Sequence, residues 1–160
     1  MRRTILLCVV VLLALVFAAQ PTGATPSTDV EIVVTSYWED GFGTFTLSGG
    51  GLGGCESGTT ADLGDSLTGH PGVVGNFHVR KVFTCADESG TFTLLIQAQT
   101  RDLITDEGRW TVLSGSGAYE KLHGTGDLLG IYIDEDGNPV EEPGTDAGII
   151  DNLTGRMHID

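Results

Sequence analysis

The sequence predicts an all-β fold in which one antiparallel barrel of about eight strands closes on itself. Two observations lead to this prediction. Short runs of alternating apolar and polar residues recur at hairpin spacing, and no helical periodicity of useful length appears after residue 24. A closed barrel leaves no unpaired edge strand, which favours it over the alternative, a two-sheet sandwich.

The first 24 residues have the pattern of a secretory signal peptide. Arg2 and Arg3 precede an uncharged apolar run over residues 5–19, and cleavage is expected after Ala18 or Ala24. A retained membrane anchor is the alternative, although an apolar run of about 15 residues is short for a span of ~20 residues.

We therefore expect a signal peptide over residues 1–24, a tether over 25–29 and one barrel domain over 30–160 of a secreted protein. Cleavage of the signal peptide removes Arg2 and Arg3 and leaves six basic residues and 22 acidic ones. The net charge of the mature chain is therefore near 6 − 22 = −16. Such a chain repels phosphates and anionic lipid, so we expect no nucleic-acid partner and no stable membrane insertion after cleavage. The charge suits solubility outside the cell or, alternatively, the binding of cations.

The cysteines predict one disulfide. Cys8 leaves with the leader, so the mature chain keeps Cys55 and Cys85, an even count in an exported protein. The bond would close a loop of about 30 residues and stabilise the fold by roughly 3–4 kcal/mol. A reactive thiol is the alternative, but the chain has no Cys-x-x-Cys.

In the first half of the chain, alternation predicts strands because neighbouring side chains of a strand point to opposite faces. These strands run over residues 30–38, 44–48, 59–63 and 75–85. Five glycines in residues 49–54 predict a surface loop. Residues 56–71 are polar, and we expect them to be irregular apart from 59–63.

In the second half, residues 91–100 form the longest regular alternation, and Ala98 belongs to its apolar row. Later strands are expected around Trp110, over 128–133, and over 148–151 and 154–159 with a break near Asn152.

Between Arg109 and Gly130, two glycine pairs are expected to form corners, because glycine reaches positive φ without steric cost. A short bend lies between the pairs, and such corners allow a curved sheet to close. The fold-defining residues of this segment are Trp110, Gly115, Gly117, Tyr119, Leu122, Gly124 and Gly126.

The run from Trp110 to Gly126 resembles the W-x-V-x-x-G-T-G-x-Y-x-x-L-x-G-x-G segment of the allene oxide cyclase-like and dirigent-like β-barrel superfamily, most closely its small bacterial secreted members. Ser116 stands where threonine is commoner, and the resemblance covers roughly residues 28–160. It implies a barrel that takes a small, mostly apolar molecule without a cofactor. It also implies a homo-oligomer, since the plant members are trimers.

Several polar residues are candidates for binding that molecule. His78 and Arg80 share one face of a strand and would form a positive patch if that face is the lumen, or a solvated patch if it is the outside. His123 and Tyr119 lie between the glycine corners. They would line the entrance if the corners form a barrel mouth; alternatively, they only cap backbone groups. The candidate ligand-binding residues are therefore His78, Arg80, Tyr119, His123, Arg156 and His158, the last two sharing a face of the final strand that could approach Glu31.

No metal or cofactor is expected, because the histidines lack metal-site spacing and residues 134–138 fit a hairpin turn better than a calcium loop. The chain has no nucleophile elbow and no P-loop, and its acids lie mostly in turns, so catalytic residues cannot be assigned. We expect a non-catalytic binding or scaffold barrel. The alternatives are a cofactor-free cyclase or isomerase resembling allene oxide cyclase, and an oligomer-forming surface protein.

Overall fold

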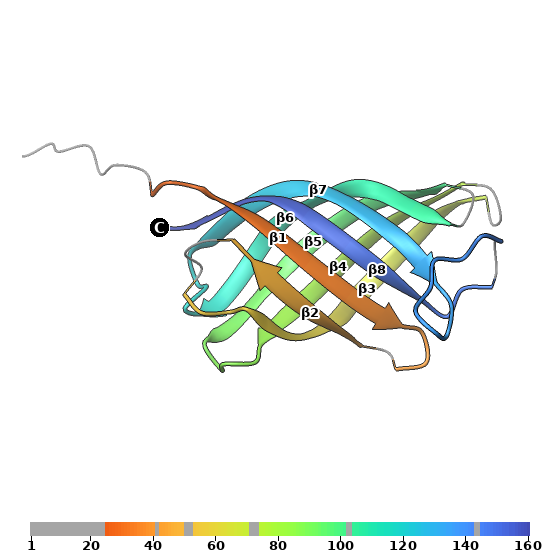
Figure 1. The fold of residues 1–160 in the computed structure, drawn as a ribbon. Helices are drawn as coiled ribbons and strands as arrows, with labels where there is room; N and C mark the ends of the chain where they lie inside the picture. Colours follow the sequence, from red (N-terminus) through yellow and green to blue (C-terminus); the bar gives the residue numbers. More distant parts are fainter. Residues whose placement is uncertain (1–24, 41, 50–52, 71–73, 102–103, 143–144) are drawn as a thin grey trace, which may run out of the picture.

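The computed structural model describes residues 25–160 apart from 41, 50–52, 71–73, 102–103 and 143–144, so the expected signal peptide lies outside it. The described residues form eight antiparallel strands, each paired with its neighbours in sequence, and the last strand pairs with the first (Figure 1). The strands are β1 (Thr28–Tyr37), β2 (Gly43–Ser48), β3 (Ser57–His70), β4 (Val74–Cys85), β5 (Gly90–Arg101), β6 (Thr105–Gly117), β7 (Leu122–Ile133) and β8 (Gly148–Ile159). The prediction of a closed all-β barrel is confirmed. Among the described residues, no helix is long and apolar enough to cross a membrane.

Two predicted irregularities are wrong. Residues 56–71 are not a loose segment, because Ser57–His70 forms the 14-residue strand β3. Its polar residues pair along β4, and the register shifts between Asp62 and Asp65, where Gly64 has φ of +124°. Likewise, β8 runs unbroken through Asn152, which pairs with β1 and β7 and alternates with buried neighbours. A polar residue on the outward row of a strand does not interrupt the backbone ladder.

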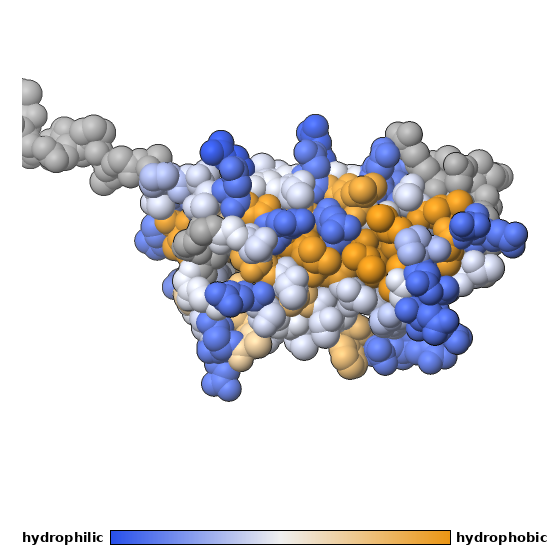
Figure 2. Space-filling view, in the orientation of Figure 1, coloured by the Kyte–Doolittle hydropathy of each residue, from blue (hydrophilic) through white to orange (hydrophobic). Residues whose placement is uncertain are grey.

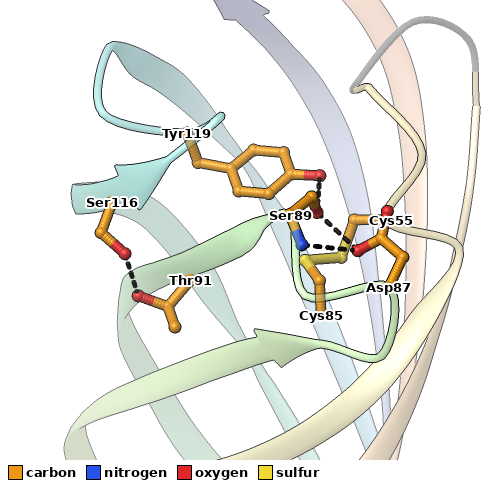
Figure 3. The surroundings of a disulfide bond; sticks show 7 residues. All are labelled: Cys55, Cys85, Asp87, Ser89, Thr91, Ser116 and Tyr119. Carbon is orange, nitrogen blue, oxygen red and sulfur yellow. Dashed lines mark hydrogen bonds between the residues drawn. A yellow bond between two sulfur atoms is a disulfide. The ribbon is translucent and has the colours of Figure 1, made fainter.

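One end of the barrel is filled by aromatic rings. Phe83 and Phe92 stack with their ring centroids 4.8 Å apart, and Phe45 meets Phe83 edge-on at 5.1 Å. Tyr119 packs against Phe92 at 5.7 Å and shares a hydrogen bond of 2.9 Å with the hydroxyl of Ser89 (Figure 3). Because these side chains are buried in the lumen, this end is closed.

The predicted disulfide joins Cys55 to Cys85 at the same end and is confirmed (Figure 3). Both cysteines are buried. The bond ties the loop between β2 and β3 to the turn between β4 and β5. It therefore stabilises the closed end of the barrel and leaves the opposite end to other interactions.

The second glycine pair has a role other than the corner predicted for it. Gly124 and Gly126 lie inside β7, opposite Met157 and Gly155 of β8. A Cβ atom added at Gly126 would lie 2.6 Å from Nε1 of the buried Trp110, and one at Gly155 would lie 2.6 Å from Cζ2 of the same ring. These glycines make room for the indole. In the first pair, Gly117 ends β6 with φ of +62°, in agreement with a corner, whereas Gly115 lies within the strand.

Gly126→Ala should therefore destabilise the protein by about 1–3 kcal/mol or more, because the added methyl overpacks the space of the indole. Urea unfolding measures the loss. Asp127→Ala is the matched control: the Asp127 side chain is 80% exposed, so its replacement should change the free energy of unfolding by less than about 0.5 kcal/mol. Equal stabilities for the two variants would contradict the packing role of Gly126.

Candidate functional site: a cavity in the lumen

A cavity of about 230 Å³ occupies the half of the lumen away from the disulfide. Its lining includes the end of β1, which lies at the right-hand end of the barrel in Figure 1. Trp38 and Phe42, in the connection between β1 and β2, line the cavity and are 50% and 57% exposed, so they form its rim. Its apolar walls comprise Phe77, Val79, Ile96, Ala98, Leu128 and Ile149. The other lining residues are mostly polar, so apolar and polar side chains share the cavity.

Two aspartates line the cavity from the strands on either side of a glycine. Asp106 of β6 lies opposite Gly130 of β7, which lies opposite Asp151 of β8. A Cβ atom at Gly130 would be 2.8 Å from Oδ1 of Asp151 and 3.1 Å from Cβ of Asp106. The absence of a side chain at residue 130 therefore gives both aspartates room, and each is only 7% exposed.

Burial shifts the protonation of this group. It raises the pKa of Asp151 to about 7; the positive charge of Lys81 opposes the shift, and the negative charges of Asp106 and Asp62 add to it. Burial also raises the pKa of Asp106. Tyr132 donates a hydrogen bond to Asp106 over 3.2 Å, and burial raises the pKa of Tyr132 to about 12. At neutral pH the tyrosine is thus a donor, while Asp151 is close to its midpoint.

Lys81 supplies the positive charge of the cavity. Its Nζ lies 2.7 Å from Oδ1 of Asp62, its partner in the register of β3 and β4. The Lys81 side chain is 8% exposed and that of Asp62 is 49% exposed, so the pair extends from the lumen toward solvent. The Lys81 ammonium forms its ion pair with Asp62, so Asp106 and Asp151 have no ion-pair partner among the described cavity residues.

On β1, β2 and β3, two hydroxyl side chains flank a glycine in the same way as the two aspartates flank Gly130. Ser36 of β1, Gly43 of β2 and Thr60 of β3 lie opposite one another. The hydroxyl oxygens of Ser36 and Thr60 are buried without a hydrogen-bond partner among the described residues. An unsatisfied buried hydroxyl costs about 1–3 kcal/mol, so these groups are suited to a polar partner supplied from the cavity.

The residues predicted on β4 face away from this site. His78 and Arg80 are exposed on the outer surface, whereas Phe77, Val79 and Lys81 line the cavity. The inward basic group is therefore Lys81. The signal for it was present in the sequence, since a lone lysine alternates with apolar residues on an otherwise hydrophobic face of the strand.

The other predicted binding residues lie in the half of the barrel away from the cavity. Tyr119 is fully buried in the closed end. The rings of His123 and His158 stack at 5.3 Å between centroids, and their Nε2 atoms lie 3.3 and 3.6 Å from the Asp160 carboxylate. Within the part of the chain that the structure describes, no group of His, Cys, Asp and Glu is arranged to hold a metal ion.

Arg156 also lies outside the cavity. It pairs with Asp29, its register partner on β1, at 3.1 Å and not with Glu31, whose partner in register is Thr154. The Arg156 and Asp29 side chains are 67% and 88% exposed, so this ion pair belongs to the outer surface.

Sequence reasoning missed the acidic residues of the cavity. Asp106 lies between the strands expected over residues 91–100 and around Trp110, and Asp151 lies at the edge of the expected break in the last strand. The spacing of Ile149, Asp151 and Leu153 was the available signal, because it places an acid on an apolar row.

No family model, curated protein or solved structure matches the chain. Membership of the allene oxide cyclase-like or dirigent-like superfamily therefore stays a prediction. What the chain could bind follows from the cavity itself.

Proposed function

We propose that this barrel binds one small molecule in its lumen cavity. The observation that carries the proposal is a cavity of about 230 Å³ whose lining combines apolar side chains with several buried polar groups. Binding sites in proteins commonly combine an apolar lining with a few placed polar groups and residues of perturbed pKa. The resemblance to barrels that take small apolar molecules supports the same proposal.

The site of action belongs to the proposal as well. A buried disulfide fits an extracellular protein, because such bonds persist in oxidising compartments. We propose that residues 1–24 direct secretion and are removed, so that the barrel meets its ligand outside the cell. Mass analysis of the protein from culture medium would give a chain beginning after Ala18 or Ala24, and a full-length mass would contradict removal.

Ala98→Phe should abolish binding, because residue 98 lines the cavity and the added ring would occupy it. The probe is 2-phenylethanol, followed through NMR shifts of methyl groups in the cavity. We expect saturable shifts in the wild type and none in Ala98→Phe. Gln97→Phe is the matched control, since Gln97 is exposed on the outer face of the same strand. If Ala98→Phe binds as the wild type does, the probe lies elsewhere.

A cofactor-free isomerase is the second candidate, favoured by one observation. The carboxyl of Asp151 has a pKa of about 7 and lies near Lys81 in a cavity, and a general base works best when its pKa is close to the working pH. The rate at which the protein catalyses exchange of the α-protons of cyclohexanone in D2O should rise with pH, with a midpoint near 7. Asp151→Asn should abolish this catalysis. His78→Ala is the control, and a rate that depends on His78 instead of Asp151 would reject this site.

An oligomeric surface protein is the third candidate. Figure 2 shows an apolar strip along the outer face over β1, β8 and β7, where Val33, Ile150, Leu129 and Ile131 are partly or fully exposed. Light scattering would give a mass that rises with concentration and falls to the monomer mass in Leu129→Lys. A fixed monomer mass in the wild type would reject this function.

A further inference from the structure

We infer that the ligand of this cavity is a small organic cation, an ammonium group attached to an apolar body, held between Asp106 and Asp151. This inference rests on the proposed function and adds the chemical class of the ligand. It follows from the charge balance of the cavity, from the geometry around Gly130 and from the polar groups left without partners.

The charge balance selects the sign of the ligand. Among the described lining residues, Lys81 is the one cation and Asp62, Asp106 and Asp151 are the acids. The 2.7 Å pair between Lys81 and Asp62 neutralises one of each. Where the remaining carboxyls are ionised, they make the cavity negative, which attracts a cation and repels a carboxylate or phosphate.

The geometry provides a place for the charged group. Asp106 and Asp151 flank Gly130, and the Cδ1 methyl of Ile149 lies beside them, 2.8 Å from the place of a Cβ atom at residue 130. Asp106 accepts hydrogen bonds from the side chains of Tyr132 and Thr100. The Asp151 carboxylate has no hydrogen bond within the described part of the chain, although it is 93% buried. An ammonium donates three hydrogen bonds, and the oxygens of the two carboxylates can accept them.

The hydroxyls of Ser36 and Thr60 are a second, independent indication of a polar ligand. Ser36 and Thr60 line the cavity from β1 and β3, are at least 91% buried and have no hydrogen-bond partner among the described residues. Their oxygens can accept bonds from a ligand as the carboxylates do. These groups do not belong to the acidic cluster, so two separate observations indicate a polar ligand.

The rest of the cavity determines the ligand's body and its route of entry. The walls around Ile96, Ala98 and Leu128 are apolar and suit a hydrocarbon or a single ring. At the rim, Trp38 lies 6.2 Å from Tyr132 between ring centroids. Aromatic faces attract organic cations, so the rim favours the same class of ligand.

Binding should depend on pH through Asp151. The titratable or charged groups that face it are Lys81 on β4, Asp62 on β3, Asp106 on β6 and Tyr132 on β7; β1 contributes Tyr37, and the cavity residues from β2 and β5 carry no charge. A bound cation favours the ionised carboxyl. Binding near pH 7 should therefore release a proton from Asp151, and the affinity for the cation should fall as the pH drops below 7.

The test compares three probes that share a phenylethyl group by isothermal titration: 2-phenylethylamine, 2-phenylethanol and 3-phenylpropionate. At pH 8 we expect the amine to bind at least about tenfold more tightly than the alcohol, since charge-assisted hydrogen bonds are worth this much, and the anion to bind most weakly. Asp151→Asn should reduce the preference for the amine to within about threefold, and Asp106→Asn should also weaken it. The matched control is Asp127→Asn on the outer face of β7, which removes the same charge from the chain.

The outcomes separate the two proposals. An amine preference that is lost in Asp151→Asn and kept in Asp127→Asn supports cation selectivity. Equal binding of amine and alcohol, or tighter binding of the anion, overturns cation selectivity and leaves a lumen site that Ala98→Phe still blocks. Absence of binding by all three probes overturns the proposed function itself. Thermal midpoints of the variants verify that each is folded.

Discussion

Asp151→Asn is expected to stabilise the ligand-free protein at pH 8, by at most about 4 kcal/mol. The folded state holds the Asp151 carboxyl at a pKa of about 7, roughly 3 units above the ~3.9 of an unfolded chain, and each unit corresponds to about 1.4 kcal/mol. Because the folded pKa is raised, the wild type loses stability as the pH rises from about 4 through 7. Asparagine has nearly the same shape and no charge to desolvate, although a buried amide without hydrogen-bond partners offsets part of the gain.

The pH profile makes this prediction specific. Below pH 4 the carboxyl is protonated in both states, so wild type and variant should have similar free energies of unfolding. Their difference should grow through the window that ends near pH 7 and then stay constant. Burial also raises the pKa of Asp106, which contributes a dependence of the same sign in both proteins.

Urea unfolding at several pH values provides the measurement. Asp127→Asn is the control, because the Asp127 carboxylate is 80% exposed and should give a curve parallel to that of the wild type. If Asp151→Asn is less stable than the wild type at pH 8, the carboxylate is needed by the fold and is not a group kept for a ligand. A stabilising change that removes cation binding is the pattern expected of a functional residue.

Removal of the disulfide is expected to cost about 3–4 kcal/mol, because the bond between Cys55 and Cys85 spans a sequence separation of 30 residues and restricts the unfolded chain. The double variant Cys55→Ser/Cys85→Ser should show this loss in urea. The wild type with reductant should give a similar value. Probe binding should persist in folded protein, since the bond lies at the closed end and the cavity at the other.

Ser89→Ala serves as the comparison for the closed end. It removes the hydrogen bond between the hydroxyls of Ser89 and Tyr119 and leaves the disulfide in place (Figure 3). A loss of about 1 kcal/mol is expected for such a bond. If the double cysteine variant loses no more than Ser89→Ala, the disulfide does not restrain the chain as described.

The fold was predictable from sequence because strand periodicity is local. The alternation of residues 91–100 and the even cysteine count lead directly to β5 and to the disulfide. β3 was not predictable to its full length, because its polar residues satisfy their backbone groups through β4, a partner that local pattern does not reveal. Tertiary pairing overrides local propensity in such strands.

The cavity was harder to predict, because its residues come together only when the barrel closes. Asp106 and Asp151 are 45 positions apart in sequence and become neighbours through Gly130, whose role depends on the register of three strands. For β4, the alternation separated the face of His78 from that of Lys81 but did not say which face is inside. Which face points into the lumen depends on how the closed sheet curves, and the alternation within one strand carries no information about that curvature.

Native mass spectrometry of the wild type and Ala98→Phe, purified side by side and titrated with 2-phenylethylamine at pH 8, tests the central claim most directly. A lumen site predicts one bound molecule per wild-type chain and none on Ala98→Phe. Bare masses for both proteins, or equal uptake by both, would contradict the claim that this barrel holds a small molecule in its cavity.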